Sequence, residues 1–455
     1  MAPLGSEQRP LRVAIVGSGP SGFYAADALF KSAIHVSIDS FDRLPTPFGL
    51  LRGGVAPDHQ KMKSVGAYYE RVADANATRF RWFGNVEVGR DITIDELKQY
   101  YDAVILAVGA QTDRTLGIPG ETKAGVYGAT EFVGWYNGHP DYQNLEFDLN
   151  HESVVVIGQG NVAIDVTRIL VKPIDELRKT DIPDPILNKL ATSKVKTVHL
   201  VGRRGPVQSA FTELEIKEFG EIHGVDVVID PSDMAINPAS QSELDDDTNN
   251  KAKKNMAVLR DYVANPRRGG SKQVVVRFLE GPVEIGGDDR VSEIILEKNN
   301  LIGDPGHQQA VGTGEKIRLN TGLIFKSIGY KGTAIPGVPF DQKSGTIPHQ
   351  AGAIVGLPGC YVAGWIKRGP RGVLGTNKPC STETIATLLA DLERLRPCSQ
   401  PELSAVEAIL SQRGVRWITY SEWKKIDKIE KERGTELGKP REKFTRLDQI
   451  LEVLG

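Results

Sequence analysis

The chain has 455 residues, too many for one ordinary hydrophobic core, so we expect two or three domains. Its composition, 40% hydrophobic and 25% charged, is typical of a globular protein, and a net charge of −2 excludes a general nucleic-acid binder. The apolar runs are too short to predict a membrane span, and the polar stretch 1–9 does not fit a signal peptide.

Residues 13–22 predict a buried strand, a tight glycine turn and a helix beginning near Pro20. In the pattern GxGxxG, Gly17 makes the turn, Gly19 allows a pyrophosphate to approach the backbone, and Gly22 lets the helix pack closely on the strand. The phosphates would lie at the positive N-terminus of the helix. This context favours a dinucleotide site over an ordinary β-turn-α unit.

A second strand, 35–41, ends at Asp42, twenty positions after Gly22 (42 − 22 = 20) and where a carboxylate reaches a ribose hydroxyl. The Pro- and Gly-rich run 44–59 is a shaped loop, and we expect a helix near Asp58 with that residue as its cap. Residues 102–110 predict a buried strand whose small final residues, including Gly109, can lie against a flat ligand.

A second strand-turn-helix follows at 153–171, with the pattern GxGxxA over residues 158–163. Two such patterns in one chain indicate two dinucleotide sites. The next strand, 196–201, ends at Gly202, Arg203 and Arg204. Arginines at this place accept a 2′-phosphate, so the residues predict NADP rather than NAD, against the alternative of a solvated arginine pair.

Residues 236–272 predict a polar, irregular and basic segment that is either a partner-binding patch or a solvated face, and its cations are Lys251, Lys253, Lys254, Arg260, Arg267, Arg268 and Lys272. Strands 273–279 and 292–298 are expected to pair in antiparallel fashion. A strand at 323–330 is expected to return the chain to the first domain. Another strand, 360–365, precedes a glycine-rich turn and a helix over about 379–395, and the tail is expected to be helical around 423–433.

Four segments together resemble the adrenodoxin reductase family and its branch of NADPH–ferredoxin reductases: 44–59, the GxGxxA turn, 201–206 and 364–370. The resemblance spans essentially the whole chain. It implies an α/β fold of glutathione-reductase-like architecture, with two three-layer Rossmann-like domains that bind FAD and NADP. The implied domains are 1–111 (FAD, first part), 112–330 (inserted, NADP) and 331–455 (FAD, second part, with a helical tail).

The resemblance also implies roles for particular residues. Together with the glycine turn at Gly17, Gly19, Pro20 and Gly22, the FAD site would use Ser21, Asp42, Leu50, Val86, Gly109, Gly364, Trp365, Gly372, Val373 and Leu374. The NADP site would use Gly158, Gln159, Gly160, Asn161, Val162, Arg203, Arg204, Glu215 and Gly372. Catalytic or positioning roles near the two rings fall to His59, Asp165, Glu218 and Trp365. The chain departs from the family at Asp42, where Glu is common, and at Gly22, where Ala is common in the branch.

The resemblance implies a reductase that passes electrons from NADPH to a 2Fe–2S ferredoxin, without a metal of its own. We expect the acidic ferredoxin to dock on the basic stretch at Lys251, Lys253, Lys254 and Arg260, and the protein to be a monomer or weak dimer. The alternatives are a flavin-dependent NADPH monooxygenase and an FAD- and NADP-binding redox sensor.

Cysteine usage bears on a further alternative. The three cysteines, Cys360, Cys380 and Cys398, form no C-x-x-C pair, so the sequence does not support a disulfide reductase, a disulfide framework or a metal-ligand set. This usage fits a reducing compartment, the bacterial cytoplasm or the mitochondrial matrix.

Overall fold

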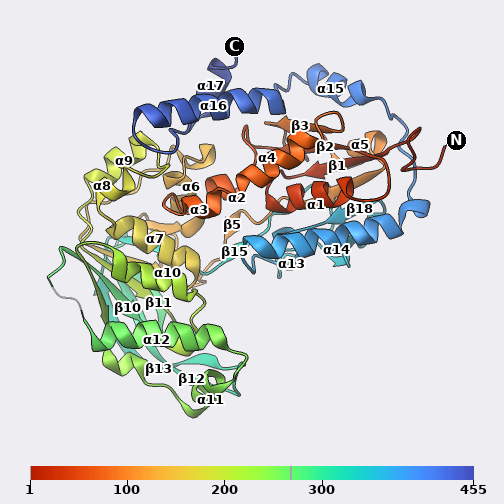
Figure 1. Ribbon diagram of the computed structural model, residues 1–455. Helices are drawn as coiled ribbons and strands as arrows, with labels where there is room; N and C mark the ends of the chain where they lie inside the picture. The colour runs from red at the N-terminus through yellow and green to blue at the C-terminus, as the bar shows by residue number, and fades with distance from the viewer. Residues whose placement is uncertain (1, 267–268) are drawn as a thin grey trace.

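The structure is a computed structural model that describes residues 2–266 and 269–455. Its first sheet has seven strands in the order β16–β17–β18–β4–β1–β2–β3, of which the last five run parallel (Figure 1). The strands are β1 (Leu11–Val16), β2 (Val36–Asp42), β3 (Phe80–Gly84), β4 (Ala103–Leu106), β16 (His349–Gln350), β17 (Ala353–Ile354) and β18 (Cys360–Val362).

Helices from both ends of the chain cover this first sheet. From the N-terminal part come α1 (Pro20–Phe30), α2 (Leu50–Gly53), α3 (Gln60–Lys63), α4 (Gly66–Ala75) and α5 (Ile94–Tyr100). From the C-terminal part come α13 (Trp365–Arg368), α14 (Asn377–Ala390), α15 (Leu403–Gln412), α16 (Tyr420–Glu436) and α17 (Leu447–Glu452). In Figure 1 the red helix α1 and the blue helix α14 lie side by side, so residues more than 350 positions apart build one unit.

The second sheet has six parallel strands in the order β6–β14–β7–β8–β10–β9. They are β6 (Val126–Gly128), β7 (Ser153–Ile157), β8 (Thr197–Val201), β9 (Val225–Ile229), β10 (Lys272–Arg277) and β14 (Leu323–Lys326). The accompanying helices are α6 (Ala129–Tyr136), α7 (Asn161–Val171), α8 (Ile174–Leu177), α9 (Asp184–Ala191), α10 (Glu213–Glu218), α11 (Pro238–Asp245) and α12 (Asn250–Ala264).

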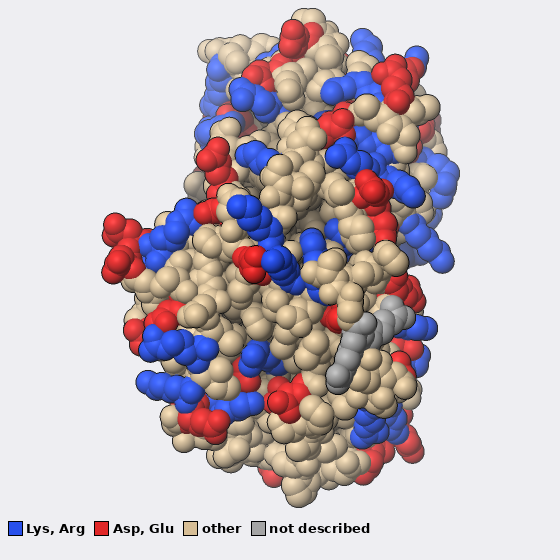
Figure 2. All heavy atoms as spheres, turned by 90° about the vertical axis from the view of Figure 1, so that its left-hand side faces the viewer, with Lys and Arg blue, Asp and Glu red and all other residues tan. Residues whose placement is uncertain are grey.

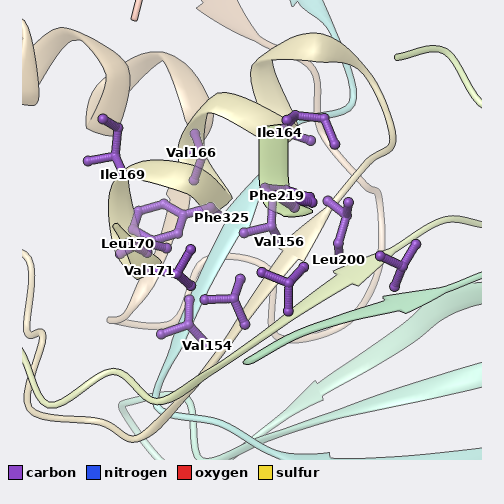
Figure 3. Packing of buried hydrophobic residues seen from close by; sticks show 14 of the residues in the cluster. Val154, Val156, Ile164, Val166, Ile169, Leu170, Val171, Leu200, Phe219 and Phe325 are labelled. Carbon is purple, nitrogen blue, oxygen red and sulfur yellow. The ribbon is translucent and has the colours of Figure 1, made fainter. Parts of the chain in front are cut away.

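The core of this second unit lies between its helices and its sheet. Val154 and Val156 of β7 point toward Ile164 and Ile169 of α7, and Phe325 of β14 fills the space beside them (Figure 3). A parallel sheet is buried on both faces, which explains why its strands read as continuous apolar runs. The predicted α/β class with two parallel-sheet units is confirmed.

Two smaller sheets complete the fold. A short antiparallel ribbon of β5 (Thr112–Asp113) and β15 (Tyr330–Lys331) lies where the chain leaves and re-enters the first unit. A separate antiparallel sheet consists of β11 (Glu280–Gly286), β12 (Glu293–Ile302) and β13 (Gln309–Asn320).

Three expectations about secondary structure and pairing were wrong. Segment 236–272 is not irregular, since α11 and α12 occupy most of it. The strand at 273–279 does not pair with 292–298: β10 lies between β8 and β9, and β12 lies between β11 and β13. The strand expected to return the chain to the first unit, β14, belongs to the second sheet, and the return follows at β15.

The predicted cap of the helix after residue 58 was also wrong. Helix α3 begins at Gln60, and His59 occupies the cap position without a side-chain hydrogen bond. The Asp58 carboxylate binds Arg168 and Lys172 of the second unit instead, with shortest distances of 2.8 Å to each. A buried carboxylate gains more from two cations than from one amide of a helix only four residues long.

Candidate active site

The first glycine turn is shaped by close backbone contacts. Gly17 has φ of +104°, and a Cβ there would lie 2.5 Å from the carbonyl oxygen of Ala107. A Cβ at Gly22 would lie 2.1 Å from the carbonyl oxygen of Gly17. Gly19 precedes α1 and no side chain caps that helix, whose N-terminal amides are therefore available to an anion.

The end of β2 lies next to this turn. Asp42 accepts hydrogen bonds from the amide and hydroxyl of Ser18 at 2.9 and 2.6 Å, and from the amide of Leu44 at 3.0 Å. Burial nevertheless raises the pKa of Asp42, because desolvation outweighs these three bonds. Val86 is buried, and its amide donates to the Asp42 carbonyl at 2.8 Å, so both predicted residues lie at this strand end.

The loop before α2 is strained where it passes Gly19. Phe48 has φ of +80°, and its amide donates to the carbonyl of Ser18 at 2.9 Å. Its ring is buried against Phe23 and Tyr69, which holds this backbone in place. Gly49 has φ of +48°, and Leu50, which begins α2, is partly exposed. The arrangement keeps side chains away from the approach to Gly19.

The C-terminal segment completes the first turn. Gly364 has φ of +81°, and a Cβ there would lie 2.2 Å from the Ser21 hydroxyl oxygen. That hydroxyl donates to the side-chain oxygen of Asn377 at 3.0 Å, which also accepts from Arg368 at 2.8 Å. The ring of Trp365 lies 5.7 Å from that of Tyr330. The structure therefore brings Ser21 and Gly364 together, as predicted for one site.

The remaining predicted residues of this first group differ in exposure. Gly372 has φ of +86°, and a Cβ there would lie 2.5 Å from the Thr376 hydroxyl oxygen. Val373 is 60% exposed, whereas Leu374 packs partly on the core of the first unit. Gly109 follows β4 with φ of +76° and open space around its Cα.

The second glycine turn repeats the first. Gly158 has φ of +133°, and a Cβ there would lie 2.1 Å from the Ser327 carbonyl oxygen. Gly160 precedes α7 without a side-chain cap, and a Cβ there would meet nothing within 4 Å. The carbonyl of Gln159 accepts from the amides of residues 210 and 211, and the Asn161 side chain accepts from that of residue 212. Val162 lies within the first turn of α7 and packs partly on the core.

The two arginines after β8 have different surroundings. Arg204 lines a cavity of about 210 Å³, together with Gln208, Glu243 and Lys251. Both side chains are exposed, and Arg203 is not among the residues that line this cavity.

A buried ionic cluster joins the two units. His59 Nε2 lies 3.1 Å from both carboxylate oxygens of Glu218 and 3.8 Å from Glu215 Oε2. Arg168, which is 1% exposed, contacts Glu218 at 3.0 Å and Asp165 at 2.8 Å through separate nitrogens. The loop before α3 thus meets α7 and α10 of the second unit, and the structure brings His59, Asp165 and Glu218 into one cluster.

The remaining contacts of Arg168 fix the cluster to the loop before α3. Its Nε and Nη2 atoms bind the two oxygens of Asp58 at 2.8 and 3.0 Å. Lys172, one turn further along α7, also binds Asp58 at 2.8 Å. One guanidinium therefore neutralises carboxylates from three chain segments, and the bidentate geometry sets how the loop lies on α7.

The carboxyl groups of the cluster differ in the direction in which their pKa values shift. The hydrogen bond from His59 and the charge of Arg168 hold the pKa of Glu218 below its ordinary value, whereas burial raises that of Asp165. Burial and the charge of Asp165 raise the pKa of Glu215 to about 7. The hydrogen bond to Glu218 raises the pKa of His59 against desolvation. Near neutral pH, Glu215 can therefore hold or release a proton.

His59, Glu215 and Glu218 are also the residue types that bind metal ions, with ligand atoms within 4.8 Å of one another. Arg168 already places a guanidinium nitrogen 3.0 Å from Glu218 and 3.6 Å from Glu215. A second cation there would meet that charge, so we assign no metal to the cluster.

The sequence did not single out Arg168, and it misassigned Asp58. Neither belongs to a glycine pattern, and an arginine on a helix is usually a solvated residue. One signal was available: Arg168 lies in the mostly apolar run 162–171, where Asp165 is the only other charged residue and a buried charge needs a partner.

Comparison with known proteins gives a consistent result. The pyridine nucleotide-disulphide oxidoreductase family matches residues 11–258. The chain is 44% identical to the NADPH-ferredoxin reductase FprA of Mycobacterium tuberculosis, over 98% of this chain and 99% of that protein. It is 42% identical to the mitochondrial NADPH:adrenodoxin oxidoreductase of Arabidopsis thaliana, covering 98% of this chain and 96% of that one. The solved structure of M. tuberculosis FprA in complex with NADPH superposes with a TM-score of 0.93 at 43% identity, covering 98% and 100% of the two chains.

Proposed function

The chain belongs to the pyridine nucleotide-disulphide oxidoreductase family, among its NADPH–ferredoxin and NADPH–adrenodoxin reductases, and from this premise we propose that it is an FAD-containing NADPH–ferredoxin oxidoreductase. One observation carries the proposal most strongly. Two glycine turns, each followed by a helix without a side-chain cap, lie in two units that meet at the His59–Arg168 cluster.

The first turn fits FAD. Gly17 and Gly22 leave no room for side chains, and the amides of α1 suit a diphosphate. Asp42 would bind ribose, and the strained loop at Leu50 would border the flavin with Val86 and Gly109. Residues 364–374 would cover the flavin ring, with Trp365 at its edge. We propose that segments 1–111 and 331–455 form this FAD domain, and that 112–330 form the NADP domain.

The second turn fits NADP. The amides of α7 after Gly160 suit its diphosphate, and Arg204 offers a guanidinium to a 2′-phosphate. Glu215, with a pKa of about 7, can donate or accept a hydrogen bond near the nicotinamide end. Gly372 would leave space for the nicotinamide.

Bound FAD would supply the redox chemistry, taking a hydride from NADPH and releasing the electrons one at a time. The residues of the chain would bind the two coenzymes, orient their rings and exclude water from between them. Arg168 holds Glu218 as an anion, and Glu218 holds His59 by its hydrogen bond. This cluster ties the two units to each other, and it would thereby help to orient the two rings when both coenzymes are bound.

A disulfide reductase is a poorer fit. All three cysteines are free, and burial raises the pKa of Cys360 to about 11, which makes it a poor nucleophile. Among the described residues no helix is long and apolar enough to cross a bilayer. Free thiols support a reducing compartment, and we propose the bacterial cytoplasm or the mitochondrial matrix.

For the ferredoxin we propose a docking surface on α12. Lys253 and Arg260, seven residues apart, lie on one side of this helix, and Lys254 adjoins them. Lys253 pairs with the fully exposed Asp247, and Lys254 lies 3.6 Å from Glu213. Such surface ion pairs are weak, so carboxylates of an acidic partner can replace Asp247 and Glu213 in them. On the face in Figure 2, basic and acidic side chains are interspersed, so a partner must use a local patch rather than the field of the whole face.

Among the further members of the basic stretch, Lys272 does not support this surface. Lys272 donates to the Leu170 carbonyl at 2.9 Å and is partly buried. Arg267 and Arg268 lie outside the described residues.

Charge reversal tests the docking surface. The triple variant Lys253→Glu, Lys254→Glu, Arg260→Glu should raise the KM for ferredoxin about tenfold or more at low salt, because complementary charges steer the encounter. Ferricyanide reduction should not change. Lys189→Glu, on the exposed side of α9, is the control. Equal ferredoxin kinetics in the triple variant and the control would contradict the assignment.

The experiment that tests the function is a comparison of NADPH with NADH under anaerobic stopped-flow conditions. We expect NADPH to bleach the flavin absorption rapidly and NADH to do so slowly. Equal rates would contradict the assignment of Arg204 to a 2′-phosphate. A long-lived oxygenated flavin after mixing with air would favour a monooxygenase, and slow turnover with every acceptor would favour a redox sensor.

A further inference from the structure

The cavity beside Arg204 contains a second cation. Lys251 lies at the start of α12 and lines this cavity of about 210 Å³ together with Arg204. The cavity is smaller than the 300–1,000 Å³ typical of sites for whole drug-sized ligands. It therefore suits one charged group of a larger ligand rather than a complete dinucleotide.

Within the described part of the chain, neither cation pairs directly with a carboxylate, although the charge of Arg204 helps to lower the pKa of Glu243 in the same cavity. In the described ranges, 2–266 and 269–455, neither Arg204 nor Lys251 forms a salt bridge, whereas Lys253 and Lys254 both do. The acid in the cavity, Glu243, is occupied by neutral donors, the amide of Gly306 and the side chains of Gln208 and Gln308. Burial and the charge of Arg204 lower the pKa of Lys251, as expected for two cations that face one another.

Lys251 is also tied to the second glycine turn. Its ammonium donates to the carbonyl of Ala210 at 2.6 Å, and the amide of Ala210 donates to the carbonyl of Gln159 at 2.9 Å. Two consecutive hydrogen bonds therefore connect this lysine with the turn that would hold the diphosphate. In this type of fold, a phosphate on the adenosine ribose lies close to the diphosphate and near the end of the strand that follows the nucleotide-binding helix. Here that strand is β8, and Arg204 lies just after it.

We propose that Lys251 is a specificity-determining residue that holds the 2′-phosphate of the dinucleotide together with Arg204. The inference rests on the proposed use of NADPH. It replaces the expectation that Lys251 docks ferredoxin, and it gives Arg204 a partner other than Arg203. The dianionic phosphate binds both cations and offsets the repulsion between them across the cavity.

The test uses the FAD-loaded protein and isothermal titration with adenosine 2′,5′-bisphosphate, with 5′-AMP as the ligand without the 2′-phosphate. In Lys251→Ala we expect affinity for the bisphosphate to fall about tenfold or more, since charge-assisted hydrogen bonds have this magnitude. Affinity for 5′-AMP should not change. Lys251→Arg should retain most of the affinity, and Lys189→Ala, at an exposed site on α9, should match the wild type.

Steady-state kinetics gives a second readout. In Lys251→Ala the KM for NADPH should rise by a similar factor, while the KM for NADH and the kcat with ferricyanide stay within about twofold of wild type. Bisphosphate affinity in Lys251→Ala equal to that in Lys189→Ala would overturn the inference while leaving the proposed function intact. A wild type that binds the bisphosphate no better than 5′-AMP would overturn both.

Discussion

At the scale of single residues, function depends on a few charges held away from water. Glu215 and Glu218 lie three residues apart on α10, yet their pKa values shift in opposite directions. Glu218 receives the hydrogen bond from His59 and the closer contact from Arg168, whereas Glu215 is buried beside Asp165. Such a separation of two neighbouring carboxyl groups is typical of sites that handle charge.

Glu215 should make both stability and nucleotide binding depend on pH. Because its folded pKa of about 7 lies above the ordinary value of 4.5, the folded state retains the proton longer than the unfolded chain. The free energy of unfolding should therefore fall as pH rises between about 4.5 and 7. The KM for NADPH should rise across pH 7, since ionised Glu215 repels the anionic nucleotide. Chemical denaturation and kinetics measured at several pH values test both effects.

The matched variant is Glu215→Gln, which cannot ionise. We expect it to lose the component of the stability slope between about pH 4.5 and 7, and the rise in KM near pH 7. A variant with the same two pH profiles as the wild type would show that another group titrates.

At the scale of elements, α7 connects the nucleotide turn at its N-terminus with the ionic cluster one to three turns later. Gly160 and Asn161 begin the helix, and Asp165, Arg168 and Lys172 follow on the side that meets the loop before α3. A nucleotide bound at one end of α7 is therefore fixed relative to the first unit by the other end.

Arg168→Met should destabilise the fold and make its stability sensitive to pH. Removing the guanidinium leaves Asp58, Asp165 and Glu218 short of a buried cation, a change that costs about 3–5 kcal/mol. The loss should shrink as pH falls, because protonated carboxyl groups need no counterion. Urea denaturation at two pH values measures both effects. Arg178→Met, at an exposed position beyond α8, is the control, and equal losses in the two variants would contradict this role.

Local secondary structure could be predicted from the sequence, whereas the pairing of distant strands could not. Both glycine turns and their strands and helices are local patterns, so the sequence predicts them and the structure confirms them. The pairing of β10 with β8 and β9 depends on contacts distant in sequence, and its apolar run also fits an antiparallel pair. Asp58 misled the prediction because a local rule for caps competed with Arg168, which lies 110 residues away.

For the candidate site, the family resemblance implied that His59 and Glu218 lie near one place, and the structure brings them to 3.1 Å. It could not assign Lys251 to the cavity beside Arg204, because that depends on how α12 lies against the turn after β8. The coenzyme contacts of the individual residues remain predictions.

At the scale of the whole molecule, the C-terminal tail ties the two units together. Glu430 of α16 is fully buried and binds Arg52 of α2, with 2.8 Å between Nη1 and Oε2. Further along, Lys443 contacts Asp181 at 3.0 Å, and Lys63 of α3 contacts the same carboxylate at 2.8 Å. In Figure 1 this blue segment runs along one edge, past α4 to α9. The tail therefore constrains how the units sit across the proposed electron path.

Asp181→Asn tests the junction of the tail with the two units. It leaves Lys63 and Lys443 buried without their shared anion, which should cost about 3–5 kcal/mol in the free energy of unfolding. Burial already lowers the pKa of both lysines, so the unfolded chain binds more protons. Stability of the variant should therefore rise with pH toward the ordinary lysine value more steeply than in the wild type.

Denaturation curves across alkaline pH measure this slope. Asp175→Asn, at an exposed position on α8, is the control for loss of a surface carboxylate. If Asp181→Asn were no less stable than that control, the tail would not be anchored through this carboxylate.

In the proposed reaction this chain converts the hydride of NADPH into single electrons for a ferredoxin. The most direct measurement is anaerobic stopped-flow mixing of the FAD-loaded protein with NADPH, followed by addition of a 2Fe–2S ferredoxin in excess. We expect rapid bleaching of the flavin by NADPH and then reduction of two ferredoxin molecules for each NADPH consumed. Rapid bleaching with no electron transfer to any ferredoxin offered would contradict the proposed reaction.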